Sequence, residues 1–358
     1  MPHTIVLAGG GTGGHVYPAL AMGDALRARG HRVLYYGDGA RLEGRVAPQR
    51  GYDFRAVDAR AYPRAGLAGK ARFAVDLARS VWSARALLRA DGATLVLGVG
   101  GYVMAPTVLA AWTLGVPSAI HEANAAPGLA NRLCARVARL LLLTFEETAA
   151  KLPGRAERVT VGCPVDPKIL SGDRAAAAAR YGLDPARPTL LVVGGSLGAK
   201  TINALGIACG RRGGAQILHV AGPRFVDEVR AAWGDVPPHV RLVGYEDRMA
   251  DAYAVADLVV CRAGSSTLAE LAALGKPAVL VPSPNVTDNH QEANARGVER
   301  VGGAKVLLEA GFDADRAAAD VLALLADRGA LLRMGDAQRT LGRTDAAERV
   351  AGLLDARF

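Results

Sequence analysis

Two glycine-rich turns, one in each half of the chain, are the residues whose types and spacing point most directly to chemistry. The first turn, Gly9–Gly14, follows the apolar run Ile5–Ala8, and the second, Gly194–Gly198, follows Leu190–Val193. A strand that passes through a glycine turn into a helix can cradle a phosphate, because backbone N–H groups approach closely and the helix N-terminus carries partial positive charge. One cradle in each half predicts two phosphorylated ligands that meet in a cleft.

Candidate acid–base groups lie in the first half of the chain. His15 follows the first glycine turn at the start of an expected helix, so we expect its imidazole to point toward the cradle. Its predicted role is that of a general base, with a capping or hydrogen-bonded histidine as the alternative. The segment His121–Asn124 lies at the end of another strand, and Glu122 there is either a partner of His15 or a rival base. The alternative for this segment is ordinary turn chemistry.

A further glycine turn, Gly98–Val103, follows a strand in the same half. Its three glycines indicate close backbone approach to an anionic group, and tight packing is the alternative. The residues expected to hold that anionic group are Gly10, Gly11, Gly100, Gly101 and Tyr102.

The second half carries its strongest pattern where the strand ending near Cys261 leads into Ser265–Thr267. Hydroxyls and free N–H groups at the start of a helix can bind a diphosphate. Glu270 follows on the same helix, where its carboxylate can accept two ribose hydroxyls, although an ordinary capping box is the alternative. The segment 288–295 is rich in amides and has an imidazole, which suits hydrogen bonding to sugar hydroxyls.

Apolar strand-like runs alternate with helical patterns along the whole chain, which is typical of parallel sheets covered by helices. We expect strands near 4–8, 32–36, 94–98, 117–121, 139–143, 158–161, 189–193, 215–220, 240–243, 257–261, 277–281 and 304–308. The predicted fold is therefore α/β, with two Rossmann-like domains whose parallel sheets face a cleft. We place the first domain at 1–162, the second at 163–342, and a helix that packs back on the first domain at 343–358.

Composition fits a cytosolic protein of two domains. The chain has 358 residues, of which 51% are apolar, and this length exceeds one ordinary core. Its four cysteines show no metal-binding spacing, so we expect buried thiols in a reducing compartment, and the N-terminus does not resemble a signal peptide. The uncharged segment 92–120 could span a bilayer by length, but its glycines and prolines favour a buried strand–helix–strand unit.

Positive charge is concentrated in the first half. Residues 55–89 hold eight basic and two acidic residues, which gives six of the nine net positive charges of the chain. We expect either the solvated face of an amphipathic helix or a patch that rests on anionic lipid; nucleic acid is a weaker option, because no nucleic-acid-binding motif accompanies the charge. The basic residues are Arg55, Arg60, Arg64, Lys70, Arg72, Arg79, Arg85 and Arg89, and the interleaved apolar residues are Leu67, Phe73, Val75, Leu77, Val81, Trp82, Leu87 and Leu88.

Several longer blocks together resemble the MurG family of peptidoglycan N-acetylglucosaminyltransferases. These blocks are GGGTGGHVYPALA (9–21), GVGGYVMAPTVLAAWTLGVPSAIHEANAAPGLANR (98–132), VGGSLGAKTIN (193–203), DRMADAYAVADLVVCRAGSSTLAELAALGKPAVLVP (247–282) and DNHQEANA (288–295). They occur in order over nearly the whole chain. The resemblance implies the glycosyltransferase B fold, no catalytic metal or other cofactor, and a peripheral location on the cytoplasmic face of the cell membrane.

The resemblance also implies a reaction and its partners. N-acetylglucosamine would pass, with inversion, from UDP-N-acetylglucosamine to the C4 hydroxyl of undecaprenyl-diphospho-N-acetylmuramoyl-pentapeptide, whose diphosphate would occupy the glycine turns of the first half. Other cell-wall synthesis enzymes are candidate partners. Thr12, Gly13, Gly14 and Asn124 would contribute to the donor site and reaction centre, and the donor pocket would be lined by Ser196, Ser265, Ser266, Thr267, Leu268, Glu270 and Gln291.

The chain departs from the family pattern at three positions. Asp166 stands in place of a donor-binding arginine, Leu197 in place of glutamine, and Glu246 in place of an apolar residue that contacts uracil. These departures motivate one alternative, a nucleotide-sugar sensor without turnover. A second alternative is a nicotinamide-dependent dehydrogenase, which would use the G-x-G-x-x-G pattern of Gly9–Gly14 together with Asp38.

Overall fold

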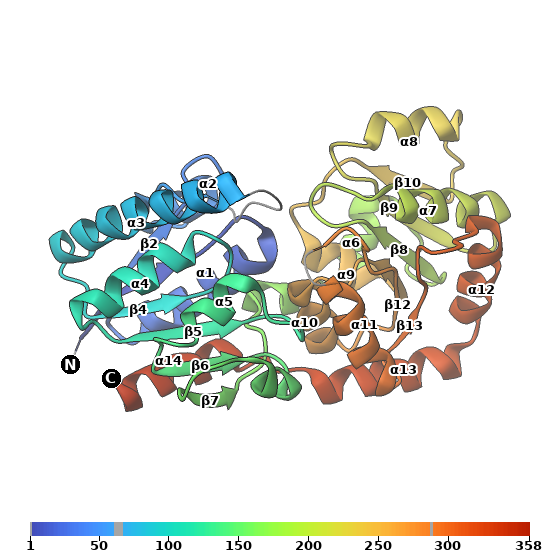
Figure 1. Cartoon of the computed structure of the whole chain (residues 1–358). Helices are drawn as coiled ribbons and strands as arrows, with labels where there is room; N and C mark the ends of the chain where they lie inside the picture. The colour runs from blue at the N-terminus through green and yellow to red at the C-terminus, as the bar shows by residue number, and fades with distance from the viewer. Residues whose placement is uncertain (1, 61–66, 287–288) are drawn as a thin grey trace. The chain divides into compact units, whose positions relative to one another are not determined.

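The computed structural model describes residues 2–60, 67–286 and 289–358, and these divide into two compact units (Figure 1). Unit 1 comprises Met1–Asp166 together with Arg343–Phe358, and unit 2 comprises Pro167–Gly342. The units part after Asp166, whereas the sequence placed the boundary after residue 162.

Unit 1 is built on a sheet of seven parallel strands in the order β3-β2-β1-β4-β5-β6-β7. The strands are β1 (Thr4–Ala8), β2 (Arg32–Gly37), β3 (Asp53–Ala56), β4 (Leu95–Gly98), β5 (Ser118–Glu122), β6 (Leu140–Leu143) and β7 (Glu157–Thr160). The helices are α1 (Gly13–Ala28), α2 (Leu42–Gln49), α3 (Leu67–Ala90), α4 (Met104–Leu114), α5 (Leu129–Cys134) and α14 (Ala346–Arg357).

Helices cover both faces of this sheet, because alternate residues of each strand point to opposite sides. Ile5 and Leu7 of β1 pack in one core with residues of α1 and α14, while Val6 and Ala8 pack in the other with residues of α3 and α4. The C-terminal helix α14 is thus part of the unit 1 core, and its Asp355 also bonds Arg29 at 2.6 Å.

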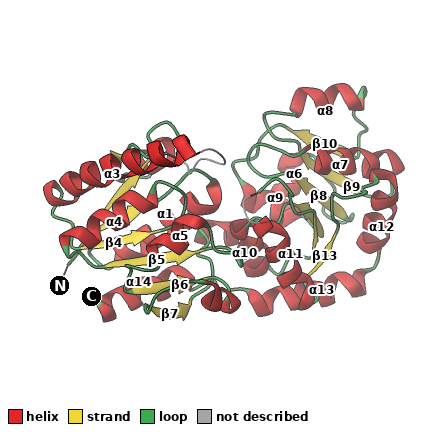
Figure 2. Ribbon diagram, viewed as in Figure 1, coloured by secondary structure: helices red, strands yellow, loops and turns green. Residues whose placement is uncertain are grey.

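Unit 2 repeats the design with six parallel strands in the order β10-β9-β8-β11-β12-β13 (Figure 2). Its strands are β8 (Thr189–Val193), β9 (Gln216–Val220), β10 (Val240–Val243), β11 (Leu258–Cys261), β12 (Ala278–Leu280) and β13 (Ala304–Val306). Its α-helices are α6 (Arg174–Tyr181), α7 (Lys200–Arg212), α8 (Val226–Trp233), α9 (Met249–Val255), α10 (Ser265–Leu274), α11 (His290–Arg300), α12 (Ala314–Ala326) and α13 (Arg328–Leu341).

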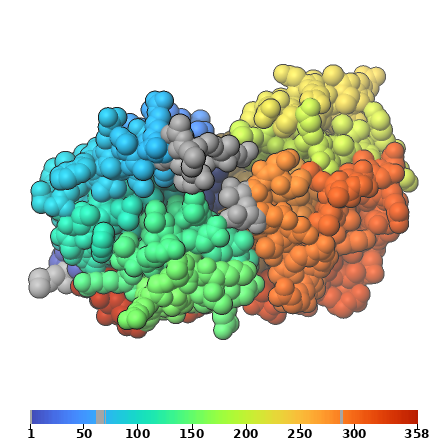
Figure 3. Space-filling view, viewed as in Figure 1, coloured from blue at the N-terminus to red at the C-terminus, as the bar shows by residue number. Residues whose placement is uncertain are grey.

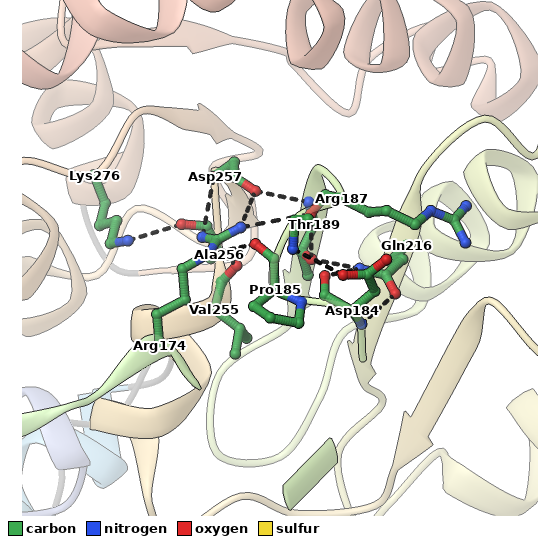
Figure 4. Close-up of polar contacts among 11 residues, drawn as sticks. Arg174, Asp184, Pro185, Arg187, Thr189, Gln216, Val255, Ala256, Asp257 and Lys276 are labelled. Atoms are coloured by element: carbon green, nitrogen blue, oxygen red, sulfur yellow. Dashed lines mark hydrogen bonds and ion pairs between the residues drawn. The ribbon is translucent and has the colours of Figure 1, made fainter. Parts of the chain in front are cut away.

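A network of polar side chains fixes the starts of the unit 2 strands (Figure 4). The guanidinium of Arg174 and the N–H of Thr189 both bond the carboxylate of Asp257, at 2.9 and 2.8 Å. Lys276 donates to the carbonyl of Ala256 at 2.7 Å, and burial lowers its pKa to about 8. These groups satisfy one another at the amino edge of the sheet, whereas the glycine turn follows β8 at the carboxyl edge, where open α/β sheets bind ligands.

The predicted class of two Rossmann-like parallel-sheet domains is confirmed, and each expected strand is present within a few residues of its predicted bounds. The sequence prediction missed β3, a short edge strand whose residues Asp53–Ala56 show no apolar run. Arg55 therefore lies on strand β3, where it bonds Asp91, and does not belong to the basic helix face in which the sequence prediction grouped it. The uncharged segment 92–120 forms β4, α4 and β5, and among the described residues no helix is long and apolar enough to cross a membrane.

Candidate functional site

The two glycine turns of unit 1 contact each other directly. The N–H of Gly10 donates to the carbonyl of Gly100 at 3.2 Å. Gly101 adopts a φ of 78°, and a Cβ there would overlap the carbonyl of Gly10. Glycine is therefore needed where the two backbones approach this closely. The structure thus supports the tight-packing alternative for the second turn.

His15 lies against this junction of the two turns. Its ring occupies the space above Gly100, where a Cβ would come within 2.6 Å of the imidazole Cδ2. The Nδ1 atom lies 3.3 Å from the hydroxyl of Thr12, the residue that precedes α1 as its N-cap. His15 itself is not the cap, so the structure places an oriented, half-buried imidazole at the carboxyl edge of the sheet.

Glu122 is engaged in the backbone of its own loop. The carboxylate is 2% exposed and accepts hydrogen bonds from the N–H groups of Asn124 at 2.9 Å and Gly128 at 3.2 Å, as well as from the amide of Asn131. Burial raises its pKa to about 7. Glu122 thus shapes the loop that carries Asn124, and His15 is the more exposed of the two candidate bases.

Four of the five residues expected to hold an anion already use their N–H or hydroxyl within the protein. Besides the bond from Gly10 to Gly100, the N–H of Gly100 lies 3.3 Å from the Sδ of Met104. The N–H of Gly11 donates to both carboxylate oxygens of Glu43, at 3.1 and 3.0 Å, and the hydroxyl of Tyr102 donates to Asp38 at 2.9 Å. A dinucleotide uses backbone N–H groups of this turn for its phosphates, and the N–H of Gly11 is already bonded to Glu43. This contact counts against the dehydrogenase alternative.

In unit 2, helix α10 begins directly after the strand end at Cys261. Its N-cap is Gly264, and no side chain caps it, so the capping-box alternative for Ser265–Thr267 is wrong. Glu270 accepts a hydrogen bond from the hydroxyl of Tyr253 at 2.8 Å. Leu268 packs in the core and its N–H bonds the carbonyl of Gly264, so it supports the helix and has no N–H to offer a ligand.

An open pocket of about 390 Å³ lies in unit 2 beside the glycine turn that follows β8. Gln291 of α11 lines it, and its side-chain oxygen accepts from the N–H of Ser283 at 2.9 Å. The other lining residues are Gly194, Leu197, Gly198, Ala199, Arg224, Phe225, Arg262, Ser283, Asn285 and Val286. The glycine turn and Gln291, far apart in the sequence, are thus brought together, and the exposed Ser196 lies in that turn.

Two arginines line this pocket that the sequence did not single out. Arg262 is paired with Glu309 at 2.6 Å, whereas Arg224 makes no ion pair with any carboxylate of the described residues. Arg224 follows a Gly-Pro turn and lies within no recognisable motif, so only the tertiary structure reveals it. The pocket therefore offers one uncompensated positive charge to an anionic ligand.

The segment 288–295 is only partly described, because Asp288 lies outside the described residues. Asn294 is buried and donates to the carbonyl of Ala263 at 3.2 Å, which ties α11 to the loop before α10. Its amide therefore has a structural contact, and Gln291 is the member of this segment that lines the pocket.

Each departure from the family pattern has its own surroundings. Asp166 pairs with Arg50 at 2.6 Å. Glu246 is 6% exposed, pairs with Arg180 at 3.3 Å and accepts from the hydroxyl of Tyr181 at 2.7 Å. Leu197 is 63% exposed and lines the pocket. The two carboxylates are thus compensated within their own units.

Two parallel-sheet domains with glycine turns at their carboxyl edges, one of them beside a positively charged pocket, have the architecture of the glycosyltransferases built from two Rossmann-like domains. Models of the glycosyltransferase family 28 N-terminal domain and C-terminal domain match residues 5–142 and 189–350. The chain belongs to glycosyltransferase family 28.

Similar proteins extend over the whole chain. A protein of Clavibacter michiganensis is 46% identical over 98% of this chain and 95% of its own length, and one of Acidothermus cellulolyticus is 41% identical over 98% and 97%. Both are named UDP-N-acetylglucosamine–N-acetylmuramyl-(pentapeptide) pyrophosphoryl-undecaprenol N-acetylglucosamine transferase. The crystal structure of MurG from Acinetobacter baumannii is 29% identical, has a TM-score of 0.79, and matches 99% of this chain and 100% of that one.

Proposed function

We propose that this protein transfers N-acetylglucosamine from UDP-N-acetylglucosamine to the C4 hydroxyl of undecaprenyl-diphospho-N-acetylmuramoyl-pentapeptide, with inversion, in peptidoglycan precursor synthesis. The observation that carries the proposal is the full-length identity of up to 46% with proteins named for this transfer. The site supports it, because a nucleotide diphosphate needs N–H groups and positive charge, and the acceptor hydroxyl needs a base.

The donor is assigned to unit 2. The first N–H groups of α10 at Ser265, Ser266 and Thr267 and the turn at Ser196 suit the diphosphate, which an uncompensated Arg224 would also attract. Glu270 would accept the ribose hydroxyls, and Gln291 would bond the sugar. Positive charge at the diphosphate stabilises the leaving UDP, which takes the electron pair of the broken glycosidic bond.

The acceptor is assigned to unit 1. Its C4 oxygen attacks the anomeric carbon and its proton passes to His15, whose Nδ1 is oriented by Thr12. The diphosphate of the acceptor would lie along the turns at Gly10 and Gly100–Gly101, beside Tyr102, and Gly13, Gly14 and Asn124 would border the reacting sugar. Since the N–H groups of Gly10, Gly11 and Gly100 are bonded to Gly100, Glu43 and Met104, they are not counted among the diphosphate donors.

A membrane-docking surface would bring unit 1 to a lipid-linked acceptor. On α3, which lies at the surface of unit 1 (Figure 3), Trp82 is 72% and Val75 is 52% exposed, and Trp112 of the adjacent α4 is 59% exposed. Arg72 and Arg79 are exposed on the same helix. We propose that this surface rests on the anionic cytoplasmic leaflet, making the protein a peripheral membrane protein. Of the residues that the sequence grouped in this patch, Arg64 and the side chains of Leu67 and Lys70 lie outside the described residues.

The proposal is tested by transfer of labelled N-acetylglucosamine from its UDP conjugate to the lipid-linked muramoyl acceptor. Formation of a labelled disaccharide on the lipid supports it. Binding of UDP-N-acetylglucosamine without any transfer would overturn it and favour the sensor alternative.

A further inference from the structure

Glu43 is a fully buried carboxylate beneath the first glycine turn of unit 1. It is 0% exposed and lies in a space that two glycines leave open. A Cβ on Gly10 would overlap its carboxylate, and a Cβ on Gly37 would lie 2.6 Å from its Cγ. The backbone is thus shaped around this one side chain.

Backbone N–H groups bind the carboxylate of Glu43. The N–H of Gly11 reaches both oxygens, and the N–H of Asp38 reaches Oε1 at 3.2 Å. Glu43 also lies in the first turn of α2, where the helix dipole favours negative charge. No lysine or arginine of the described residues forms an ion pair with it, so N–H groups and a helix terminus hold the charge, as they would hold a bound phosphate.

This carboxylate joins parts of the acceptor side that are distant in the sequence. It ties the first glycine turn to Asp38, which receives the hydroxyl of Tyr102. The adjacent N–H of Gly10 bonds Gly100, against which the ring of His15 lies. A shift of the first turn would therefore move both the second turn and the surface on which the imidazole rests.

We propose that Glu43 is a positioning residue: an internal anion that fills the phosphate-like nest of the first glycine turn and sets the turn in its catalytic geometry. The proposal rests on the proposed function, since it assigns the effect to the transfer reaction. It also explains how a turn that matches a dinucleotide fingerprint serves another chemistry, because the N–H that a dinucleotide would use is already bonded.

Glu43→Gln and Glu43→Asp separate charge from shape. Glutamine keeps the length but presents an NH₂ group to the N–H donors, whereas aspartate keeps the charge on a shorter chain. Glu146→Gln, on an exposed glutamate of the same unit, is the matched control. For each variant kcat, the KM of donor and acceptor, UDP affinity and the melting temperature are measured.

We expect Glu43→Gln to lower kcat by about tenfold or more through misplacement of the reacting groups, with donor KM and UDP affinity within about twofold of the parent. Glu43→Asp should recover part of that loss, and the control should match the parent. A folded Glu43→Gln variant with parental kcat, or one more active than Glu43→Asp, would overturn the proposal. If Glu43→Gln does not fold, the test falls to Glu43→Asp. A Glu43→Asp variant whose kcat and amide exchange rates both equal those of the parent would overturn the proposal.

Amide hydrogen exchange gives a readout that does not depend on turnover. Loss of the carboxylate should speed exchange in peptides that cover residues 9–15 and 98–103 and leave unit 2 peptides unchanged. Unchanged exchange in both unit 1 peptides contradicts the positioning role. Failure of the parent protein to transfer sugar would instead count against the proposed function, and the exchange result would still decide whether Glu43 holds the turn.

Discussion

The hydroxyl of Tyr253 on α9 donates to the carboxylate of Glu270 on α10 at 2.8 Å. Tyr253 is 1% exposed, and burial, followed by the charge of Glu270, raises its pKa well above the ordinary value. The phenol therefore stays protonated and holds one oxygen of Glu270 in a fixed orientation. In the proposed donor site, this contact would orient the carboxylate for the ribose hydroxyls.

Glu270→Ala should raise the KM for UDP-N-acetylglucosamine strongly. Removing the partner of buried ribose hydroxyls costs about 1–3 kcal/mol, which corresponds to roughly 5- to 150-fold in affinity. Steady-state kinetics with varied donor check this, and Asp336→Ala, at an exposed carboxylate of the same unit, serves as the control. An unchanged donor KM would refute the ribose assignment.

His15→Ala should lower kcat by about two to four orders of magnitude while UDP binding is retained, because a general base contributes only to the reacting step. Rapid-mix kinetics and calorimetric titration with UDP measure the two quantities. If kcat stays within a few-fold of the parent, His15 only packs against Gly100, and another group must take the proton.

Arg224→Ala should raise the donor KM by about tenfold, since a hydrogen bond to a charged group contributes about 1.5–3 kcal/mol and this side chain is exposed to solvent screening. Arg230→Ala removes an equal charge from the nearby α8 and should leave the KM unchanged. Equal effects of the two substitutions would show a general field effect and no contact with the diphosphate.

The pH dependence of folding stability should reflect the ionisation of Glu122. Burial raises the pKa of this carboxyl from the ordinary 4.5 to about 7. Between these values the folded protein holds the proton and the unfolded chain has released it, so this group lowers stability as pH rises. The melting temperature of the parent should therefore fall relative to that of Glu122→Gln between pH 5 and pH 7. A constant difference would show that the carboxylate is already ionised in the folded state at pH 5.

Co-sedimentation with vesicles tests the membrane-docking surface. Binding should increase with the anionic lipid content and weaken as salt rises, because attraction to the leaflet decays within about 8 Å at physiological ionic strength. The part of the binding that persists at high salt should come from apolar contacts, and Trp82→Ser should remove much of it. The double substitution Arg72→Gln and Arg79→Gln should remove the part that salt weakens. Equal binding to neutral and anionic vesicles, or none to either, would show that α3 has only a solvated face.

Local signals in the sequence are strong enough to define the α/β class, the glycine turns and the start of α10, because strand runs and helix starts depend on residues close together in the chain. Edge strand β3 escapes this reasoning, since Asp53–Ala56 is short and is held by pairing with β2. The sequence also marks His15, Glu122 and Glu270 as polar groups at strand ends or early in a helix. It does not distinguish a base from a buried loop anchor.

Only the tertiary structure decides which of these groups remain available to a ligand. Glu43 and Gly11 are 32 residues apart, yet the carboxylate takes the N–H that the G-x-G-x-x-G pattern alone would assign to a phosphate. Arg224 and Gln291 meet in one pocket for the same reason: parallel strands bring separate loops to a single edge of the sheet. Hydrogen-bond partners and burial are properties of that assembled edge, and no local pattern encodes them.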